Sequence, residues 1–189
     1  VETMNLISRS EIGLKKPTKA LMKFSVKPKG LAIHWEGTKV TLGDLEQSKK
    51  TLKAVQNSHL ANKAEGYIDI AYNLAFDYLG NIFELRGWEN KSGANGTTKA
   101  NDEYIAVVYL GGPDTPFTAE AKKALKDKIK SIISDWNVPH IYAISFFVES
   151  NEAYTYRNFE NVSRFAISYN TELDCIGAGQ YDEERWNYA

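Results

Sequence analysis

The amino-acid sequence predicts one α/β domain, in which a mixed central β-sheet is flanked by helices. Short apolar segments typical of strands alternate along the chain with longer segments of helical periodicity. No internal repeat or low-complexity segment interrupts this alternation. The chain has 189 residues, 43% of them hydrophobic and 25% charged, which is the size and balance of one globular domain. We therefore treat residues 1–189 as a single domain.

Composition argues against several classes of function. The net charge of −1 gives no electrostatic basis for binding nucleic acid or an anionic membrane surface, so neither is an expected partner. No apolar run approaches the roughly 18 residues that a membrane-spanning helix needs. Cys175 is the single cysteine, which rules out an internal disulfide framework. The first residues lack a basic segment followed by an apolar one, so no secretory signal is expected.

The first third of the chain contains an arm, a strand and a helix. Residues 1–28 are rich in lysine and weakly periodic, so we expect an irregular arm laid over the core. Residues 31–35, LAIHW, have the apolar content of a short strand. Residues 41–62 have helical periodicity, with Thr41 as the expected N-cap and Asp44 in the first turn. The apolar face of this helix consists of Leu42, Leu45, Leu52, Val55 and His59.

The middle of the chain predicts three strands. Residues 67–88 contain two strand-like runs joined at the turn 77–81, DYLGN. Residues 103–112, EYIAVVYLGG, are apolar almost throughout and end in two glycines before a proline. Such a run is typical of a strand buried on both faces, so we expect it at the centre of the sheet.

The last third contains the clearest helix. Residues 118–136 have a buried stripe at helical spacing and a capping residue, Thr118, at their start. Residues 140–150 predict a further strand. Residues 151–170 are polar and aromatic and have no clear assignment, and residues 175–189 predict a glycine-rich bend followed by a short amphipathic stretch. The stripe of the helix consists of Ala121, Leu125, Ile129, Ile132 and Trp136.

Three short motifs in the middle of the chain resemble a known family. They are Asp69-Ile70-Ala71-Tyr72-Asn73, Leu79-Gly80-Asn81 and Leu85-Arg86-Gly87-Trp88. In this order they resemble the central signature of the type 2 N-acetylmuramoyl-L-alanine amidases, which include phage endolysins and the peptidoglycan recognition proteins. The segment ISRSEIG near the start and His59 at the end of the first helix are similar to family features too. The resemblance runs from about Ile7 to Trp136, and the segment GANGTTKAN, which contains Asn95, is most similar to amidase domains of actinobacterial phages.

The resemblance implies a single zinc ion held by two histidines and a cysteine or aspartate, with an open fourth position for water. His34, in IHWEGT, matches the first histidine, and Cys175 matches the cysteine. Tyr72 matches the tyrosine that lies near the metal. We expect His34 and Tyr72 to face each other in one cleft at the edge of the sheet. The full predicted cleft consists of His34, Trp35, Tyr72, Trp88 and Asn95.

The second histidine of the family has no counterpart at the expected place. The family carries it at the end of the strand after the long helix, where this sequence offers Ser145 or a neighbour. His140 stands at the opposite end of that strand, and an insertion at 148–170 replaces the catalytic turn. Asp174 or Glu172 is an alternative oxygen donor for zinc. We therefore expect an incomplete zinc site, with His34 and Cys175 as its vestigial ligands.

Structural interpretations remain open beside these roles. Tyr72 is equally explained as a residue packed under the first helix, whereas His59 is better explained as a core histidine and Cys175 as an inert thiol. The aromatic residues of the insertion suit either a protein interface or a small local core. These are Tyr154, Tyr156, Phe159, Phe165 and Tyr169.

The sequence favours a catalytically impaired amidase-fold protein of phage origin with a structural role or a role in binding cell wall or protein. Its expected partners are other protein subunits, such as phage virion proteins, or the stem peptide of peptidoglycan, and no cofactor is expected. The expected location is the phage virion or otherwise the host cytoplasm. The alternative is an active zinc amidase that cleaves peptidoglycan with an unusual ligand set. A third hypothesis is a protein that holds stem peptides in the cleft without cleaving them.

Overall fold

The structure is a computed structural model that describes most of the chain up to Gly111 and separate segments beyond it. The described residues are 6–25, 28, 30–35, 40–96, 98–111, 118–121, 123, 124, 127, 140–145, 165–170 and 175–180. No helix among them is both long and apolar enough to cross a membrane.

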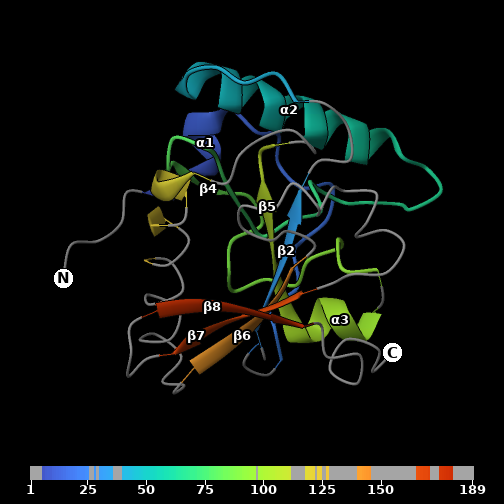
Figure 1. Cartoon of the computed structure of the whole chain (residues 1–189). Coiled ribbons are helices and arrows are strands. Elements are labelled where there is room, and N and C mark those ends of the chain that lie inside the picture. Colours follow the sequence, from blue (N-terminus) through green and yellow to red (C-terminus); the bar gives the residue numbers. More distant parts are fainter. Residues whose placement is uncertain are drawn as a thin grey trace.

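The described strands form one mixed sheet in the order β1-β4-β3-β5-β2-β6-β7-β8 (Figure 1). Parallel pairs join β1 to β4, β3 to β5, and β2 to both β5 and β6, whereas β3–β4, β6–β7 and β7–β8 are antiparallel. This confirms the predicted mixed α/β class. The strands are β1 (Leu6–Ile7), β2 (Gly30–Trp35), β3 (Leu74–Phe76), β4 (Ile82–Glu84), β5 (Tyr104–Tyr109), β6 (His140–Ser145), β7 (Phe165–Asn170) and β8 (Cys175–Gln180).

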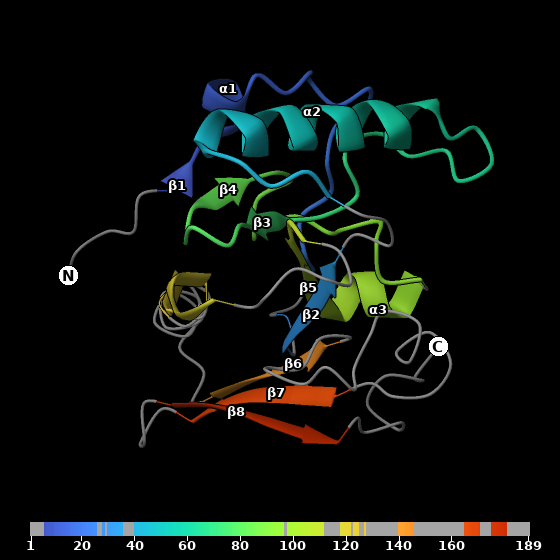
Figure 2. The same cartoon turned by 45° about the horizontal axis from the view of Figure 1, so that its top comes forward.

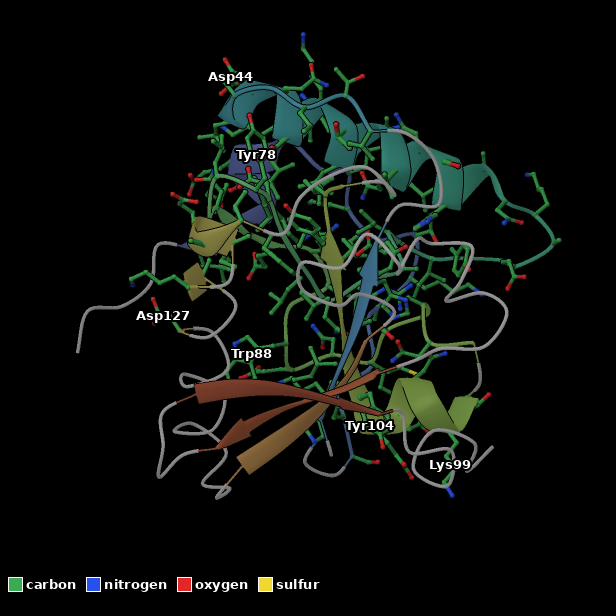
Figure 3. All side chains as sticks on the ribbon, viewed as in Figure 1. Asp44, Tyr78, Trp88, Lys99, Tyr104 and Asp127 are labelled. Atoms are coloured by element: carbon green, nitrogen blue, oxygen red, sulfur yellow. The ribbon has the colours of Figure 1, made fainter. Side chains whose placement is uncertain are left out.

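Helix α2 (Leu45–Ala61) confirms the first predicted long helix but begins later than expected. Asp44, not Thr41, is its N-cap, and the Asp44 carboxylate accepts a hydrogen bond from the Gln47 amide at 3.0 Å. The Tyr78 hydroxyl donates to the Gly43 carbonyl at 2.7 Å, which ties that residue to the turn after β3; Figure 3 shows Asp44 and Tyr78 close to this end of the helix. Leu42 therefore lies outside the helix and is 42% exposed.

The hydrophobic core lies between the sheet and the helices α1 (Arg9–Ile12) and α2, which Figure 2 shows together above β3 and β4. Every residue of β5 is buried, which confirms the prediction of a central strand. Side chains alternate along a strand, so Val108 faces α2 and Tyr109 faces away, where its ring lies 5.0 Å from that of Phe76. The core on the α2 face consists of Ile12, Leu52, Ile70, Ala75, Phe83, Leu85, Val108 and Leu110.

The second long helix begins where it was predicted. Residues 119–121, 123, 124 and 127 are helical, and Thr118 is the cap, because its Oγ1 accepts from the Ala121 amide at 3.2 Å. The helix starts against the turn after β3. Gly80 there has φ +89°, and a Cβ on it would lie 3.1 Å from the Glu120 carbonyl oxygen, so the close approach requires glycine. Residues 122, 125, 126 and 128–136 are outside the described residues, and Ala121 is the only described member of the predicted stripe.

The predicted irregular arm is wrong for its first part. Leu6 and Ile7 form β1 beside β4, and Ser8 then caps α1 by accepting a hydrogen bond from the Glu11 amide. Gly13, with φ +88°, ends this one-turn helix. Two residues and one helical turn carry too little periodicity to be recognised in a lysine-rich sequence. The small helix α3 (Thr98–Glu103), which precedes β5, was not predicted either.

The end of the chain is also more regular than predicted. Residues 165–170 of the expected insertion form β7, which pairs with β6 on one side and β8 on the other. The predicted glycine-rich bend is wrong, because Cys175–Gln180 is the strand β8. Gly177 and Gly179 suggested a bend, but both are accommodated in ladder pairs with β7. Residues 146–164 lie outside the described part of the chain, as does the predicted amphipathic stretch at 181–189.

Candidate functional site

His34 lies one residue before the end of β2, an interior strand paired in parallel with β5 and β6. Its register partner in β5 is Val108, which packs in the same core cluster as Leu52 of α2. Register partners in adjacent strands point to the same face of a sheet. His34 is thus on the α2 face near the carboxyl ends of these strands, and it is half-buried. The site is therefore not at a lateral edge of the sheet, which corrects the sequence-based expectation.

Two of the predicted cleft residues, Asn95 and Tyr72, lie against His34. Its Nε2 lies 2.8 Å from Oδ1 of Asn95, and its ring centroid lies 5.5 Å from that of Tyr72. The prediction that His34 and Tyr72 face each other is confirmed. Tyr72 reaches this position because it immediately precedes Asn73, whose backbone and side chain bond to Ala106 of β5.

The aromatic contacts continue beyond Tyr72. Its ring centroid lies 5.7 Å from that of His59, in the last turn of α2, and His59 lies 5.1 Å from Tyr67. All of these rings are half-buried. His34, Tyr72, His59 and Tyr67 thus form a row, which we call the aromatic row. Aromatic rings with partly exposed faces suit contact with the apolar parts of a peptide or sugar.

His59 is held as a neutral imidazole. Its Nδ1 accepts a hydrogen bond from the Ala71 amide at 3.0 Å, which requires an unprotonated nitrogen. Burial lowers the pKa of His59, the nearby Arg86 guanidinium lowers it further, and Asp69 partly opposes both. The neutral ring thereby fixes the backbone that leads into Tyr72.

The lowered pKa of His59 predicts a loss of stability in mild acid. The folded-state pKa lies below the unfolded value of 6.5, so protons bind more readily to the unfolded chain. The stability from neutral His59 is complete above the unfolded pKa and is lost as the pH falls from there through the folded pKa. We expect the unfolding free energy of the wild type to fall more than that of His59→Gln between about pH 7.5 and pH 5. Urea denaturation at each pH measures this, and parallel decreases in both proteins would contradict it.

Arg86 lies at the Tyr67 end of the aromatic row and is only 8% exposed. Its Nε donates to the Ile70 carbonyl at 2.8 Å and its Nη1 to the Lys91 carbonyl at 3.2 Å. A Cβ on Gly93 would lie 3.2 Å from Nη2 and 3.4 Å from the Tyr67 ring, so the absence of a side chain leaves room there. Burial and, more weakly, Arg9 lower the pKa of Arg86, whereas Asp69 raises it. An arginine nonetheless keeps its charge.

Asp69, the carboxylate that affects the pKa of Arg86, forms its salt bridge with Arg9 instead. Asp69 is fully buried and binds both Nη atoms of Arg9, at 2.6 and 3.1 Å. Its Oδ1 also accepts from the Gln56 side chain and from the Ile70 amide. No carboxylate within the described segments makes a salt bridge with Arg86. The group of two arginines and one aspartate therefore carries a net positive charge next to the aromatic row.

The structure does not bring Cys175 to His34. Cys175 pairs with Asn170, and Asn170 pairs with His140 at the amino end of β6, which runs parallel to β2. With about 3.3 Å per residue along a strand and about 4.8 Å between strands, the two residues are more than roughly 20 Å apart. Two ligands of one zinc must each lie within about 2.3 Å of it. Ser145, in contrast, pairs in register with Ile33, one residue before His34, and its place at the position of the second histidine stays a prediction.

No protein-family model matches the chain, and no curated protein matches its sequence. Solved structures do match. Drosophila peptidoglycan recognition protein SD aligns over 85% of this chain and 95% of its own, with a TM-score of 0.66 and 15% identity. Peptidoglycan recognition protein LE, solved with tracheal cytotoxin, aligns over 69% and 74% with a TM-score of 0.61 and 23% identity. The peptidoglycan recognition protein Hd from Alvinella pompejana aligns over 69% of this chain and 79% of its own, with a TM-score of 0.61 and 21% identity.

This is the peptidoglycan recognition protein fold. At these identities the likeness establishes the fold alone, which is also that of the type 2 amidases.

The described part of the site does not fit a catalytic zinc ion. Such a site needs three protein donors from histidine, cysteine or carboxylate side chains. No group of three or more such side chains among the described residues is arranged to hold a metal. Among the described residues, His34 contacts the Asn95 amide and the Tyr72 ring. The alternative donors Glu172 and Asp174 lie outside the described residues.

The two tryptophans of the predicted cleft are placed less fully. Trp35 ends β2, directly after His34, and its side chain is outside the described part. Trp88 is half-buried in the segment after β4, where Gly87 bonds to Asn73 and Asn90 pairs with Lys23 (Figure 3). Their membership of a cleft stays a prediction.

Three residues of the site, Tyr67, His59 and Arg86, were not predicted from the sequence to bind a ligand. Arg86 belongs to the motif Leu85-Arg86-Gly87-Trp88, and an arginine in a mostly apolar strand-turn segment was the available signal. That Asp69 is taken by Arg9, 60 residues away, is a tertiary fact that the sequence does not display.

Proposed function

We propose that this chain binds peptidoglycan through the aromatic row and Arg86 and does not cleave it. The observation that carries the proposal is the arrangement of the site. Four half-buried rings lie in a row next to the buried Arg86, His34 contacts the Asn95 amide and the Tyr72 ring, and no group of three zinc donors lies among the described residues. The fold, shared with a protein solved in complex with a peptidoglycan fragment, supports this ligand class.

The charge of Arg86 supports a particular type of stem peptide. Burying a charge without an opposite charge in contact with it is costly, so a ligand carboxylate at this position would be stabilised. The peptidoglycan fragment bound to the neighbour protein LE is of the diaminopimelic acid type. Diaminopimelic acid has one more carboxylate than lysine. We therefore assign Arg86 to that carboxylate and the aromatic row to the rest of the stem peptide.

The setting that we propose is a phage component that attaches to the cell wall. The segment around Asn95 is similar in style to amidase domains of actinobacterial phages, and a wall-binding protein has no need of an intact zinc site. Contacts with other protein subunits belong to the same proposal.

Sedimentation with purified, insoluble cell wall tests the binding. We expect the protein to sediment with walls of the diaminopimelic acid type and to be released by soluble stem peptide, because the site is lined for the peptide. Chitin, which has a related glycan but no peptide, is the control. Equal sedimentation with chitin and with walls, or none with either, would contradict the proposal.

The alternative function is zinc-dependent cleavage of the bond between N-acetylmuramic acid and L-alanine. It is favoured by one observation, the contact of His34 with Tyr72, since the resemblance gives these two residues to the metal site. It requires two further zinc donors from outside the described residues. The effect of His34→Ala separates the two functions, because it would abolish cleavage but would weaken peptide binding only in part.

A further inference from the structure

We infer that Asn95 is a positioning residue that fixes the tautomer of His34, so that Nε2 carries the proton and Nδ1 is the acceptor nitrogen of the neutral ring. In this state the partners that suit Nδ1 of His34 are groups that donate an N–H or O–H. A role of this tautomer in holding a stem peptide rests on the proposed function, whereas the tautomer itself does not.

The direction of the hydrogen bond follows from the chemistry of the two groups. Nε2 of His34 lies 2.8 Å from Oδ1 of Asn95, and an amide oxygen only accepts. The ring nitrogen must therefore donate. The other neutral tautomer would place two acceptors against each other at this distance.

The assignment of the amide oxygen to this side is supported by the other end of the same group. Nδ2 of Asn95 donates to the Tyr104 carbonyl at 3.1 Å. Turning the amide over would bring its oxygen against that carbonyl and lose the bond. Asn95 is 4% exposed, so water offers little compensation for such a loss.

The loop around Asn95 holds the amide in this orientation. The Asn95 backbone amide donates to Oδ1 of Asn101 at 2.8 Å, and the Ser92 hydroxyl donates to the same oxygen at 3.1 Å. Gly96, with φ +86°, makes the turn directly after Asn95. The segment SGANGTTKAN, from Ser92 to Asn101, thus has a specific task, which is to present one fixed acceptor to His34.

A fixed tautomer has a consequence for specificity. With Nε2–H directed at Asn95, the lone pair of the ring is on Nδ1, and ligand groups that donate are preferred there over groups that only accept. A peptide amide N–H is such a donor, and a carboxylate is not. At one end of the aromatic row His34 then favours ligand groups that donate a hydrogen bond, and at the other end Arg86 favours a carboxylate, which accepts.

Nitrogen-15 NMR tests the assignment without any ligand. In a long-range proton–nitrogen correlation spectrum, protonated and unprotonated ring nitrogens have well separated shifts. The chain has three histidines, and the signals missing from His34→Gln identify those of His34. At about pH 8, where an ordinary histidine is neutral, we expect Nε2 to be the protonated nitrogen in the wild type. A predominant Nδ1–H tautomer would overturn the inference.

Two variants test the role of Asn95. Asn95→Leu removes the acceptor, and we expect a mixture of tautomers and about threefold to tenfold weaker binding of stem peptide. Asn95→Asp retains an acceptor oxygen and should restore the Nε2–H tautomer. Thr98→Ala, at an exposed position of the same segment, is the control. An unchanged Nε2–H tautomer in a folded Asn95→Leu variant would overturn the assignment, whereas absence of peptide binding in the wild type would defeat only the proposed function.

Discussion

Replacing Asp69 by alanine should lower the free energy of unfolding by about 3–5 kcal/mol, because it leaves the half-buried Arg9 guanidinium without its charged partner and removes a fully buried hydrogen-bond acceptor. The Asp69 carboxylate is fully buried and accepts hydrogen bonds from Arg9, Gln56 and the Ile70 amide. Arg9 also donates to the carbonyls of Leu85 and Lys15, so it cannot readily withdraw to solvent. Denaturant unfolding followed by circular dichroism measures the change.

The control for this prediction is a pair at the surface. Glu46 and Lys49 form an i,i+3 ion pair on α2, and the Glu46 side chain is 73% exposed. Glu46→Ala should change the unfolding free energy by less than about 0.5 kcal/mol. If Asp69→Ala were no more destabilising than Glu46→Ala, the Arg9–Asp69–Gln56 network would not be what attaches the N-terminal segment to α2 and the core.

Replacing Arg86 by alanine should weaken the binding of a stem peptide of the diaminopimelic acid type by about 10- to 150-fold. This corresponds to the roughly 1.5–3 kcal/mol that a hydrogen bond to a charged group contributes. The loss should be small for the same peptide with that carboxylate amidated, because no charge is then recognised. Isothermal titration calorimetry with the two peptides measures both affinities.

Lys91→Ala is the matched control for Arg86→Ala. Lys91 lies in the same segment, and its replacement by alanine removes one positive charge, as Arg86→Ala does. In the wild type, however, the Lys91 ammonium pairs with Asp102 at 3.1 Å. We expect both peptides to bind this variant nearly as they bind the wild type. Because Arg86 also bonds to two backbone carbonyls, the melting temperature of each variant must be compared with that of the wild type. Equal loss for the free and the amidated peptide in a folded Arg86→Ala variant would refute the carboxylate assignment.

Local sequence pattern was sufficient for the longer elements of this fold. The periodicity of residues 41–62 and the apolar run of β5 depend on neighbours in sequence, and both were predicted from them. The two-residue strand β1 and the glycine-containing β8 are strands only because partners elsewhere in the chain pair with them. Pairing of that kind leaves little mark on a short segment.

In the candidate site, too, some contacts could be predicted from the sequence and others depend on the three-dimensional packing. The contact of His34 with Tyr72 was expected from a resemblance in sequence motifs, and it is present. Cys175 was assigned by its place in the linear order, but the β7–β8 hairpin carries it to the far end of the sheet. Whether Arg86 has a carboxylate in contact depends on which arginine Asp69 binds, and the sequence offers both Arg9 and Arg86 in family-like motifs. Such competition between side chains is decided by packing in three dimensions.

The most direct test of the central claim is release of muropeptides from purified cell wall by the protein with zinc in excess. The account predicts that the protein binds the wall in the same sample while the amount of free L-alanine amino ends stays at the level of a buffer control. It predicts no difference when a chelator is added. Cleavage between N-acetylmuramic acid and L-alanine that disappears with the chelator and in His34→Ala would contradict the account and establish a zinc amidase.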